Sequence, residues 1–327
     1  MGCGSIVGKK ESEGPLGALF DEVTEDVRMG SDSFEKGESA MQKRAVELAL
    51  ASAGRSAGEL DLIAGGDLLN QCIGTAFGIG AFGVPFLGLY GACSTMAESL
   101  MLASMLVDGG YAETAAAVTS SHFCAAERQF RFPLDYGGQR SQNAQWTVTG
   151  SGSVLVTSGA GKPYALVREV CPGRILDYEI TDSSNMGAAM APAAADTLAR
   201  YLRDTGRRPE DFDLIVTGDL GAVGGDLLRQ LMEREGLPLG DNYNDCGLMI
   251  YDREQQDVHA GGSGCGCSAT VLCAAILPQL RAGTLSEVLF LPTGALMSTT
   301  SSQQGEPILG ISHLLHLSSP RGEGENA

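Results

Sequence analysis

Two helical segments of this chain are apolar on every side. The first follows Cys93 and the second follows Cys267, and their apolar positions are Met96, Leu100, Met101, Leu102, Met105, Leu106 and Val107, and Val271, Leu272, Ala274, Ile276 and Leu277. A helix without a polar face is buried all round. The pattern predicts two central helices that pack together between two sheets, the second strained or kinked by Pro278.

Shorter patterns surround these helices. Residues 40–53 and 193–204 form amphipathic helices that end at Gly54 and Gly206, as expected where the chain leaves a helix at positive φ. Apolar strands are predicted at 60–64, 84–90, 114–120, 212–217 and 287–293. Strands that alternate with helices favour parallel pairing in an α/β fold. Residues 145–159 alternate and predict an edge strand, residues 126–145 predict a polar loop, and the tail from residue 318 predicts disorder.

The chain contains an internal duplication. The segment "DLIAGGDL" recurs as "DLIVTGDL" with an offset of 152 residues (213 − 61), and Gly54-Arg55 recurs as Gly206-Arg207 at the same offset. A second gapless register, with Cys93-Ser94 matching Cys267-Ser268, has an offset of 174. The second copy therefore has additional residues between its landmarks, which we place at 240–260. The registers predict two related halves, residues 1–160 and 161–327, that form one compact pseudo-twofold unit.

The net charge and the number of cysteines indicate which partners and which cellular compartment are expected. The chain has 40 acidic and 22 basic residues among 327, a net charge of −18, which argues against nucleic acid and anionic lipid surfaces as partners. Nine cysteines without a framework spacing indicate reduced thiols in a cytoplasm-like compartment. No signal peptide or apolar run of membrane-spanning length is found, so we expect a cytoplasmic protein.

Cys93 is the first candidate for chemistry. It lies in "GACST", between a predicted strand and the start of a buried helix. Unpaired backbone N–H groups and the helix dipole converge at such a position, which lowers a thiol pKa and attracts anions. The position therefore suits either a nucleophile for acyl transfer or an anion-binding pocket.

The duplicated halves and the "GACST" segment resemble the thiolase and ketoacyl-synthase superfamily. The resemblance implies a five-layered αβαβα fold with two mixed sheets and two buried central helices, and an acylated cysteine at the position of Cys93. It also implies a His and a His or Asn in the segments "VTGDLGAV" and "AGGSGCGCSA". These segments contain Asp219, Ser263, Cys265 and Cys267 instead. Without a base or a neutral donor, activation of the thiol is not expected, and a nearby Asp219 would raise the thiol pKa.

Longer strings resemble one family within that superfamily, the stage V sporulation protein AD family. They include "GPLGALFD", "GDLLNQ", "SSHFCAAERQFRFPLDYGGQR", "VTGSGSVLV" and "MGAAMAPAAADT". The resemblance implies a catalytically degenerate protein that binds dipicolinic acid (pyridine-2,6-dicarboxylate). It also implies a role, with membrane proteins of the same operon, in loading that acid as its calcium salt into the endospore. The protein would then be peripheral to the forespore or spore inner membrane, and a homodimer.

The family also has a first strand before "GPLGALFD". The segment "MGCGSIVGKKESE" replaces most of it here, which leaves two alternatives: the start of the chain is misassigned, or the edge of one sheet is weaker.

Three function classes follow: an acyltransferase that uses Cys93, a dipicolinate-binding protein, and a scaffold with a vestigial pocket. For the binding protein we expect no resident cofactor, no metal site of the protein's own and Ca²⁺ only with the ligand salt, because Cys-x-Cys lacks the paired clusters of a zinc site. In that case Arg128 or Arg131 neutralises a carboxylate, and binding strengthens with calcium if the aspartates face the pocket. The predicted pocket residues are Asp67, Cys93, Ser94, Thr95, His122, Arg128, Arg131, Asp219, Ser263, Cys265 and Cys267.

Overall fold

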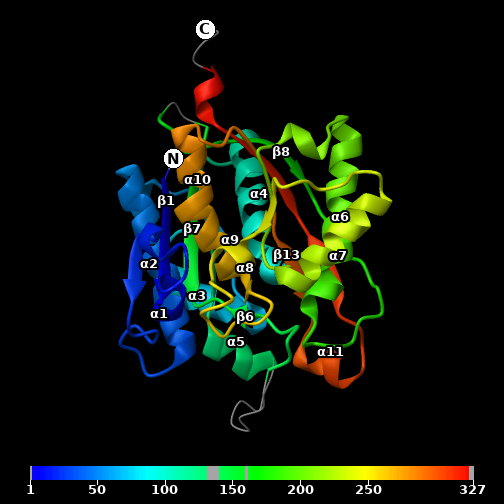
Figure 1. Ribbon diagram of the computed structural model, residues 1–327. Helices are drawn as coiled ribbons and strands as arrows, with labels where there is room; N and C mark the ends of the chain where they lie inside the picture. The colour runs from blue at the N-terminus through cyan, green and yellow to red at the C-terminus, as the bar shows by residue number, and fades with distance from the viewer. Residues whose placement is uncertain (1, 131–139, 159–160, 324–327) are drawn as a thin grey trace.

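The computed structural model describes residues 2–130, 140–158 and 161–323, and it forms five layers around two mixed sheets (Figure 1). The first sheet has the strand order β2-β1-β7-β5-β3-β4. Its strands are β1 (Gly2–Gly8), β2 (Glu22–Thr24), β3 (Leu62–Gly66), β4 (Phe86–Gly88), β5 (Thr114–Ser121) and β7 (Gly150–Thr157).

The second sheet repeats the same topology. Its order is β10-β9-β12-β15-β8, and its strands are β8 (Leu166–Cys171), β9 (Leu214–Thr217), β10 (Tyr243–Asp245), β12 (Glu287–Leu291) and β15 (Leu314–Ser318). In both sheets the strand that follows the amphipathic helix, β3 or β9, has parallel neighbours on both sides, and two antiparallel pairings follow beyond β5 or β12. The order and directions of these five strands therefore match those of β4, β3, β5, β7 and β1 in the first sheet, and β2 has no counterpart.

Successive side chains of a strand point to opposite faces of its sheet, so the apolar residues of each sheet pack both against the central layer and against the outer helices. On β5, Ala115 and Ala117 belong to the central core, while Ala116 and Val118 pack against the outer helix α2 (Phe34–Ala53). The outer helices of the second sheet are α6 (Met186–Thr205) and α7 (Gly221–Arg234). The remaining helices and short strands are α1 (Lys9–Ser12), α3 (Ile73–Ile79), α5 (Phe123–Phe130), α8 (Cys246–Met249), α11 (Thr299–Gln303), β6 (Trp146–Thr147), β11 (Gly262–Ser263), β13 (Thr293–Leu296) and β14 (Leu309–Ser312).

The central layer contains the two helices predicted from their uniform apolarity. The first is α4 (Thr95–Asp108), and the second consists of α9 (Cys265–Val271), a π-helical turn (Leu272–Ile276) and α10 (Leu277–Ala282). Helix α4 contacts α9, and both contribute to the core that joins the two sheets. Pro278 lies in the first turn of α10, directly after the π turn. The wide turn accommodates a residue that has no N–H to donate and whose ring would clash in a regular helix.

The second central helix is also the one helix of the described residues that is long and apolar enough to cross a membrane. The segment Cys265–Ala282 has a mean hydropathy of 1.3, and 78% of it is buried inside the fold. Its apolarity is therefore used for packing between the two sheets.

Three expectations from the sequence are corrected. Residues 2–8 form β1, a fully buried strand inside the first sheet, so the weakened edge is not found. Consequently β7 lies between β1 and β5 and is not an edge strand. The expected loop at 126–145 begins with the second half of α5; residues 131–139 lie outside the described residues, as does the end of the tail. The sequence did not predict β1 because the strand contains several glycines and a serine, which are not typical of strands. Small residues are required there, because Gly4 packs directly against the backbone of α2.

Equivalent aspartates hold equivalent loops in the two halves. Asp61 Oδ2 accepts the backbone N–H groups of Glu113 and Thr114, at 2.7 and 3.0 Å. Asp213, 152 residues later, accepts those of Ser286 and Glu287 at 2.6 and 3.0 Å. Each "DLI" segment thus leads into a strand, and its aspartate accepts hydrogen bonds from the backbone at the start of the neighbouring strand.

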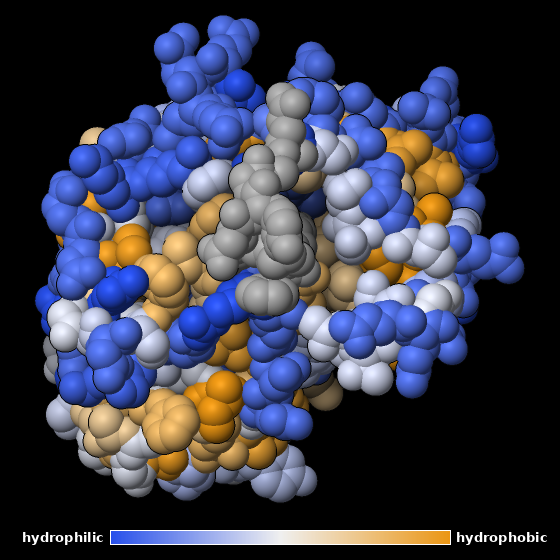
Figure 2. Space-filling model, turned by 90° about the horizontal axis from the view of Figure 1, so that it is seen from below, coloured by the Kyte–Doolittle hydropathy of each residue, from blue (hydrophilic) through white to orange (hydrophobic). Residues whose placement is uncertain are grey.

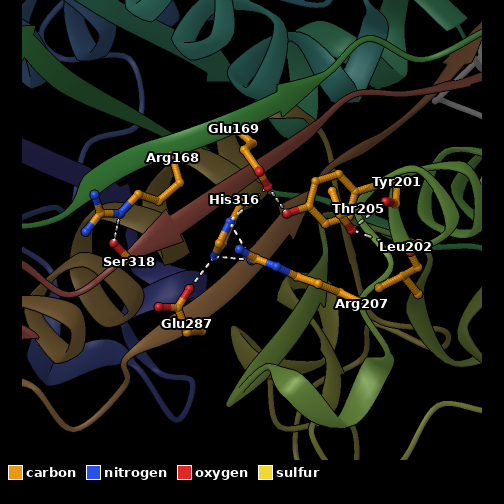
Figure 3. A network of polar contacts seen from close by, with 9 residues as sticks. All are labelled: Arg168, Glu169, Tyr201, Leu202, Thr205, Arg207, Glu287, His316 and Ser318. Carbon is orange, nitrogen blue, oxygen red and sulfur yellow. Dashed lines mark hydrogen bonds and ion pairs between the residues drawn. The ribbon is translucent and has the colours of Figure 1, made fainter.

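A polar network fastens the second sheet to α6 (Figure 3). His316 of β15 is buried between Glu287 of β12 and Glu169 of β8, and Arg207 Nη1 lies 3.0 Å from its Nδ1. The Tyr201 hydroxyl donates to Glu169 at 2.5 Å. These contacts give His316 a structural role.

Close approach of β7 to α9 gives a test of this packing. A Cβ at Gly152 would lie 2.5 Å from the Ala269 carbonyl oxygen. We expect Gly152→Ala to lower the free energy of unfolding by about 1–3 kcal/mol, because the backbones of β7 and α9 are both packed in the core and cannot move apart without a cost. Gly80→Ala is the matched control, because a Cβ at Gly80 meets nothing within 4 Å. Urea denaturation of both variants checks this, and equal stabilities would contradict it.

Candidate functional site

Cys93 lies on a tight turn between β4 and the central helix α4. It is the middle residue of a 3₁₀ turn (Ala92–Ser94), and Ala92 has a φ of 50°, a conformation that costs energy in a residue other than glycine. The Thr95 hydroxyl holds the turn, since it accepts the Gly91 N–H at 3.1 Å and donates to the Ala92 carbonyl. Ser94 Oγ accepts the backbone N–H of His313 at 3.1 Å. The hydroxyls of Ser94 and Thr95, predicted as ligand donors, thus position the turn.

A small cavity lies beside Cys93, and its lining includes residues of α5 and β6, which are at the lower end of the fold in Figure 1. Figure 2 shows the surface of that end of the molecule, where hydrophilic and hydrophobic residues are interspersed. Its volume is about 30 Å³, the room of about one water molecule. Its walls are mostly apolar, with three hydroxyl groups, one thiol and the carboxyl group of Glu127. The lining residues are Leu68, Tyr90, Ala92, Cys93, Ala126, Glu127, Phe130, Thr147, Met186, Ser263, Ala295 and Met297. A ring-sized ligand enters only when side chains move, and the unbranched Met186 and Met297 are suited to this.

Asp219 lies directly behind the cavity wall and is completely buried. Its carboxyl group accepts the Thr293 hydroxyl at 2.7 Å, the Gly264 N–H at 3.1 Å and the Ser263 hydroxyl at 3.3 Å. The Cys93 thiol also hydrogen-bonds to it. Burial raises the pKa of the Asp219 carboxyl to about 7, against the opposing effect of these donors.

The same contact keeps the Cys93 thiol protonated. Burial and the negative charge of Asp219 raise the thiol pKa well above its ordinary value. A nucleophilic cysteine needs the reverse, a cationic or basic neighbour that stabilises the thiolate. The effect of Asp219 expected from the sequence is thus found, and the arrangement does not prepare Cys93 for acyl transfer.

The other acids and thiols of the predicted set lie deeper than the cavity wall. Cys265 donates to the Ser120 carbonyl at 3.0 Å and Cys267 to the Gly218 carbonyl at 3.4 Å. Asp67 accepts the N–H groups of Leu69 and Thr75, at 2.7 and 2.6 Å. No group of three or more His, Cys, Asp or Glu within the described ranges is arranged to hold a metal ion. Cys267 lies in the first turn of α9, whereas Cys93 precedes α4, so their equivalence holds for the helix but not for the turn.

Two further residues of the predicted pocket, His122 and Arg128, lie elsewhere. His122 Nε2 lies 3.1 Å from the Val27 carbonyl oxygen and its ring packs against Phe34, so it does not line the cavity. Arg128 forms an ion pair with Glu35 and is half exposed. Arg131 lies outside the described residues. The structure thus brings Cys93, Asp219 and Ser263 together at the cavity, with Cys265 packed behind Cys93, and places His122 and Arg128 away from it.

Sequence reasoning missed most of the cavity walls. Tyr90 follows β4, three residues before Cys93, and Thr147 belongs to β6, which pairs with β11 beside Ser263. Met186 and Met297 come from the second half. The one available signal was Tyr90, an aromatic residue at the end of a strand that leads into the candidate turn. The others are brought in by contacts between the halves.

Comparison with known proteins identifies the family. The family model described as stage V sporulation protein AD matches residues 1–318. The chain is also 44% identical, over 311 residues, to stage V sporulation protein AD of Bacillus subtilis (strain 168), covering 95% of this chain and 91% of that protein. The chain belongs to the stage V sporulation protein AD family.

Solved structures with the same fold are enzymes. The structures of 3-oxoacyl-[acyl-carrier-protein] synthase III from Aquifex aeolicus VF5 and of acetyl-CoA acetyltransferase from Syntrophomonas wolfei match with TM-scores of 0.60 and 0.61. They cover 97% and 98% of this chain and 98% of their own chains, at 16% and 11% identity. The family member described here therefore has the thiolase-like α/β fold predicted from its sequence.

Thiol reactivity tests the electrostatics of the site. At pH 7.5 we expect iodoacetamide to modify Cys124, the one half-buried cysteine of the nine, well before Cys93. Incubation with acetyl-CoA should leave the protein mass unchanged, because the neutral thiol is a poor nucleophile. Intact-mass and peptide mass spectrometry measure both. A stable acetyl adduct on Cys93 would instead support acyl transfer.

Proposed function

We propose that this sporulation protein binds dipicolinic acid in the cavity beside Cys93 and supports uptake of that acid into the developing endospore. The observation that carries the proposal is the pairing of the Cys93 thiol with the buried Asp219 carboxyl. This pairing removes the nucleophile of a thiolase-like fold while the cavity itself is retained. A binding site needs fixed donors and a fitting shape but no general base.

Once the methionine side chains move aside, the groups that line the cavity can contact a flat ring that carries carboxylates. Tyr90, Thr147 and Ser263 supply hydroxyl groups, and the dipole of helix α4, which starts beside Cys93, favours a carboxylate. Leu68, Phe130 and the two methionines supply apolar walls for the faces of the ring. Family membership supports the same ligand, since the resemblance noted in the sequence implies dipicolinate.

Calcium enters this proposal only with the ligand. The oxygens of Asp67 and Asp219 are turned toward backbone and hydroxyl donors of the protein, and neither residue lines the cavity. Ca²⁺ takes six to eight oxygen ligands, which these inward-facing carboxyl groups do not offer. We therefore propose that calcium is bound by the dipicolinate itself, and the condition under which calcium strengthens binding is not met.

We also propose that the protein acts in the cytoplasm, at the forespore membrane, with membrane proteins of the same operon as partners. The resemblance supports this assignment. A net charge of −18 disfavours direct binding to anionic lipid, so the proposed attachment runs through protein contacts.

Filling the cavity tests the ligand site. We expect dipicolinate to bind the wild type. Cys93→Tyr should abolish binding, because the phenol ring occupies the space of the ligand. Cys93→Ala should weaken binding by only about 1 kcal/mol, the contribution of one neutral hydrogen bond. Isothermal titration calorimetry measures all three. Isophthalate, which lacks the ring nitrogen, is the control ligand. Equal binding by the wild type and Cys93→Tyr would place the site elsewhere.

We further propose a homodimer formed through the outer edge of the first sheet. β4 is an edge strand, with backbone groups open for pairing. Five of the eleven exposed large apolar side chains in the described residues lie on or near it: Ile73, Phe77, Phe86, Leu87 and Tyr90. Such a patch on a sheet edge fits a self-complementary twofold contact.

A charge placed in this patch should separate the subunits. Phe77 is 75% exposed, and we expect Phe77→Asp to shift the protein from a dimer to the 34.0 kDa monomer, because a buried unpaired carboxylate opposes association. Tyr111→Asp is the control, since Tyr111 is 82% exposed at the other end of α4. Sedimentation equilibrium at micromolar concentration decides, and a monomeric wild type would refute the dimer.

A further inference from the structure

The cavity beside Cys93 is backed by negative groups without a nearby counter-ion. Asp219 is completely buried, and the carboxyl group of Asp245 on β10, also buried, acts on it. Asp245 is itself held by the N–H groups of Leu220 and Gly221, at 2.8 and 3.0 Å. The ion pairs of the described residues include none with Asp219. An anionic ligand at the cavity would therefore meet a charge of the same sign across one layer of side chains.

The remaining groups that face Asp219 do not supply a positive charge. The thiols of Cys93, Cys246, Cys265 and Cys267 surround it, and burial raises the pKa of each well above its ordinary value, so all four stay neutral. Gln145 donates its side-chain amide to the Asp219 backbone carbonyl. Arg140 donates to the carbonyl of Gln145 and not to the carboxyl group.

Two groups of the cavity wall are turned toward Asp219. The Ser263 hydroxyl and the Cys93 thiol both line the cavity and both donate to this carboxyl group. An ionised carboxylate only accepts hydrogen bonds, whereas a carboxylic acid donates one and has less capacity to accept. Protonation of Asp219 would thus remove the repelling charge and release a wall donor toward the ligand.

We propose that the protein takes up one proton at Asp219 when a planar dicarboxylate binds, so that Asp219 couples ligand affinity to pH. The proton comes from the solvent and adds to the carboxylate, and no other bond is made or broken. The proposal rests on the proposed dipicolinate site. It adds a pH dependence to that function: the ligand would be bound tightly at low pH and released at high pH.

The pH range follows from the carboxyl group itself. The Asp219 pKa is about 7 in the free protein, and an anion beside it raises that value further. Binding is therefore full below this pH and weakens as pH rises through it, by about tenfold for each pH unit above about 7. The carboxyl groups of a free ligand are ionised throughout this range, since ordinary carboxyl pKa values lie near about 4.

Isothermal titration of dipicolinate at pH 6, 7, 8 and 9 tests the proposal. Parallel titrations at pH 8, in two buffers of different ionisation enthalpy, give the number of protons bound. We expect close to one proton at pH 8 in the wild type. Asp219→Asn should lose both the proton uptake and the pH dependence, and bind about tenfold more tightly than the wild type at pH 8.

Asp67→Asn is the matched control, because Asp67 is the counterpart of Asp219 in the first half and is equally buried. It should retain the pH dependence of the wild type. Should Asp219→Asn not fold, infrared difference spectra of the wild type with isotope-labelled aspartate should show a new protonated carboxyl band on addition of dipicolinate.

The possible outcomes separate the two proposals. Binding whose affinity is unchanged from pH 6 to 9, or proton uptake that persists in Asp219→Asn, overturns the role of Asp219 and leaves the ligand site intact. Absence of dipicolinate binding at every pH overturns the proposed function together with this inference.

Discussion

The fold depends on the burial of two helices that have no polar face. Helices α4 and α9–α10 cannot be exposed to water on any side, and the two sheets that enclose them satisfy this requirement. Each half contributes one sheet and one central helix, so each central helix is covered by both sheets. The strand order β1-β7-β5-β3-β4 of the first sheet matches the order β8-β15-β12-β9-β10 of the second, and β2 has no counterpart. The central layer is shared, so neither half could bury its helix alone.

The same burial determines the chemistry at Cys93. A helix that begins in the centre of the molecule places its first residues where desolvation is nearly complete, and there the identity of one neighbour decides the reactivity of the thiol. Asp219, which comes from the other half, adds negative charge at this point. In an exposed position the carboxyl group would have little influence. Inside the fold it keeps the thiol neutral, and the pKa of its own carboxyl rises to about 7.

Similarity of fold does not by itself assign an enzymatic activity to this chain. The solved structures that match include a 3-oxoacyl-[acyl-carrier-protein] synthase III and an acetyl-CoA acetyltransferase, and the turn that carries Cys93 occupies the junction between a strand and a central helix. In this chain the buried Asp219 carboxyl beside that turn raises the thiol pKa. Function follows from the site and not from the fold.

The sequence by itself determined the central helices, the duplication, the family resemblance and the neighbourhood of Cys93, Asp219 and Ser263. Each rests on local periodicity or on strings of residues that are read along the chain. It did not reveal β1, whose small residues are required by the close approach of α2, or the walls made by Thr147, Met186 and Met297. It also did not indicate that Arg128 pairs with Glu35 and that His122 packs on Phe34. Only the tertiary structure decided these, because side-chain direction and partners far apart in the chain depend on how the two halves close around the central helices.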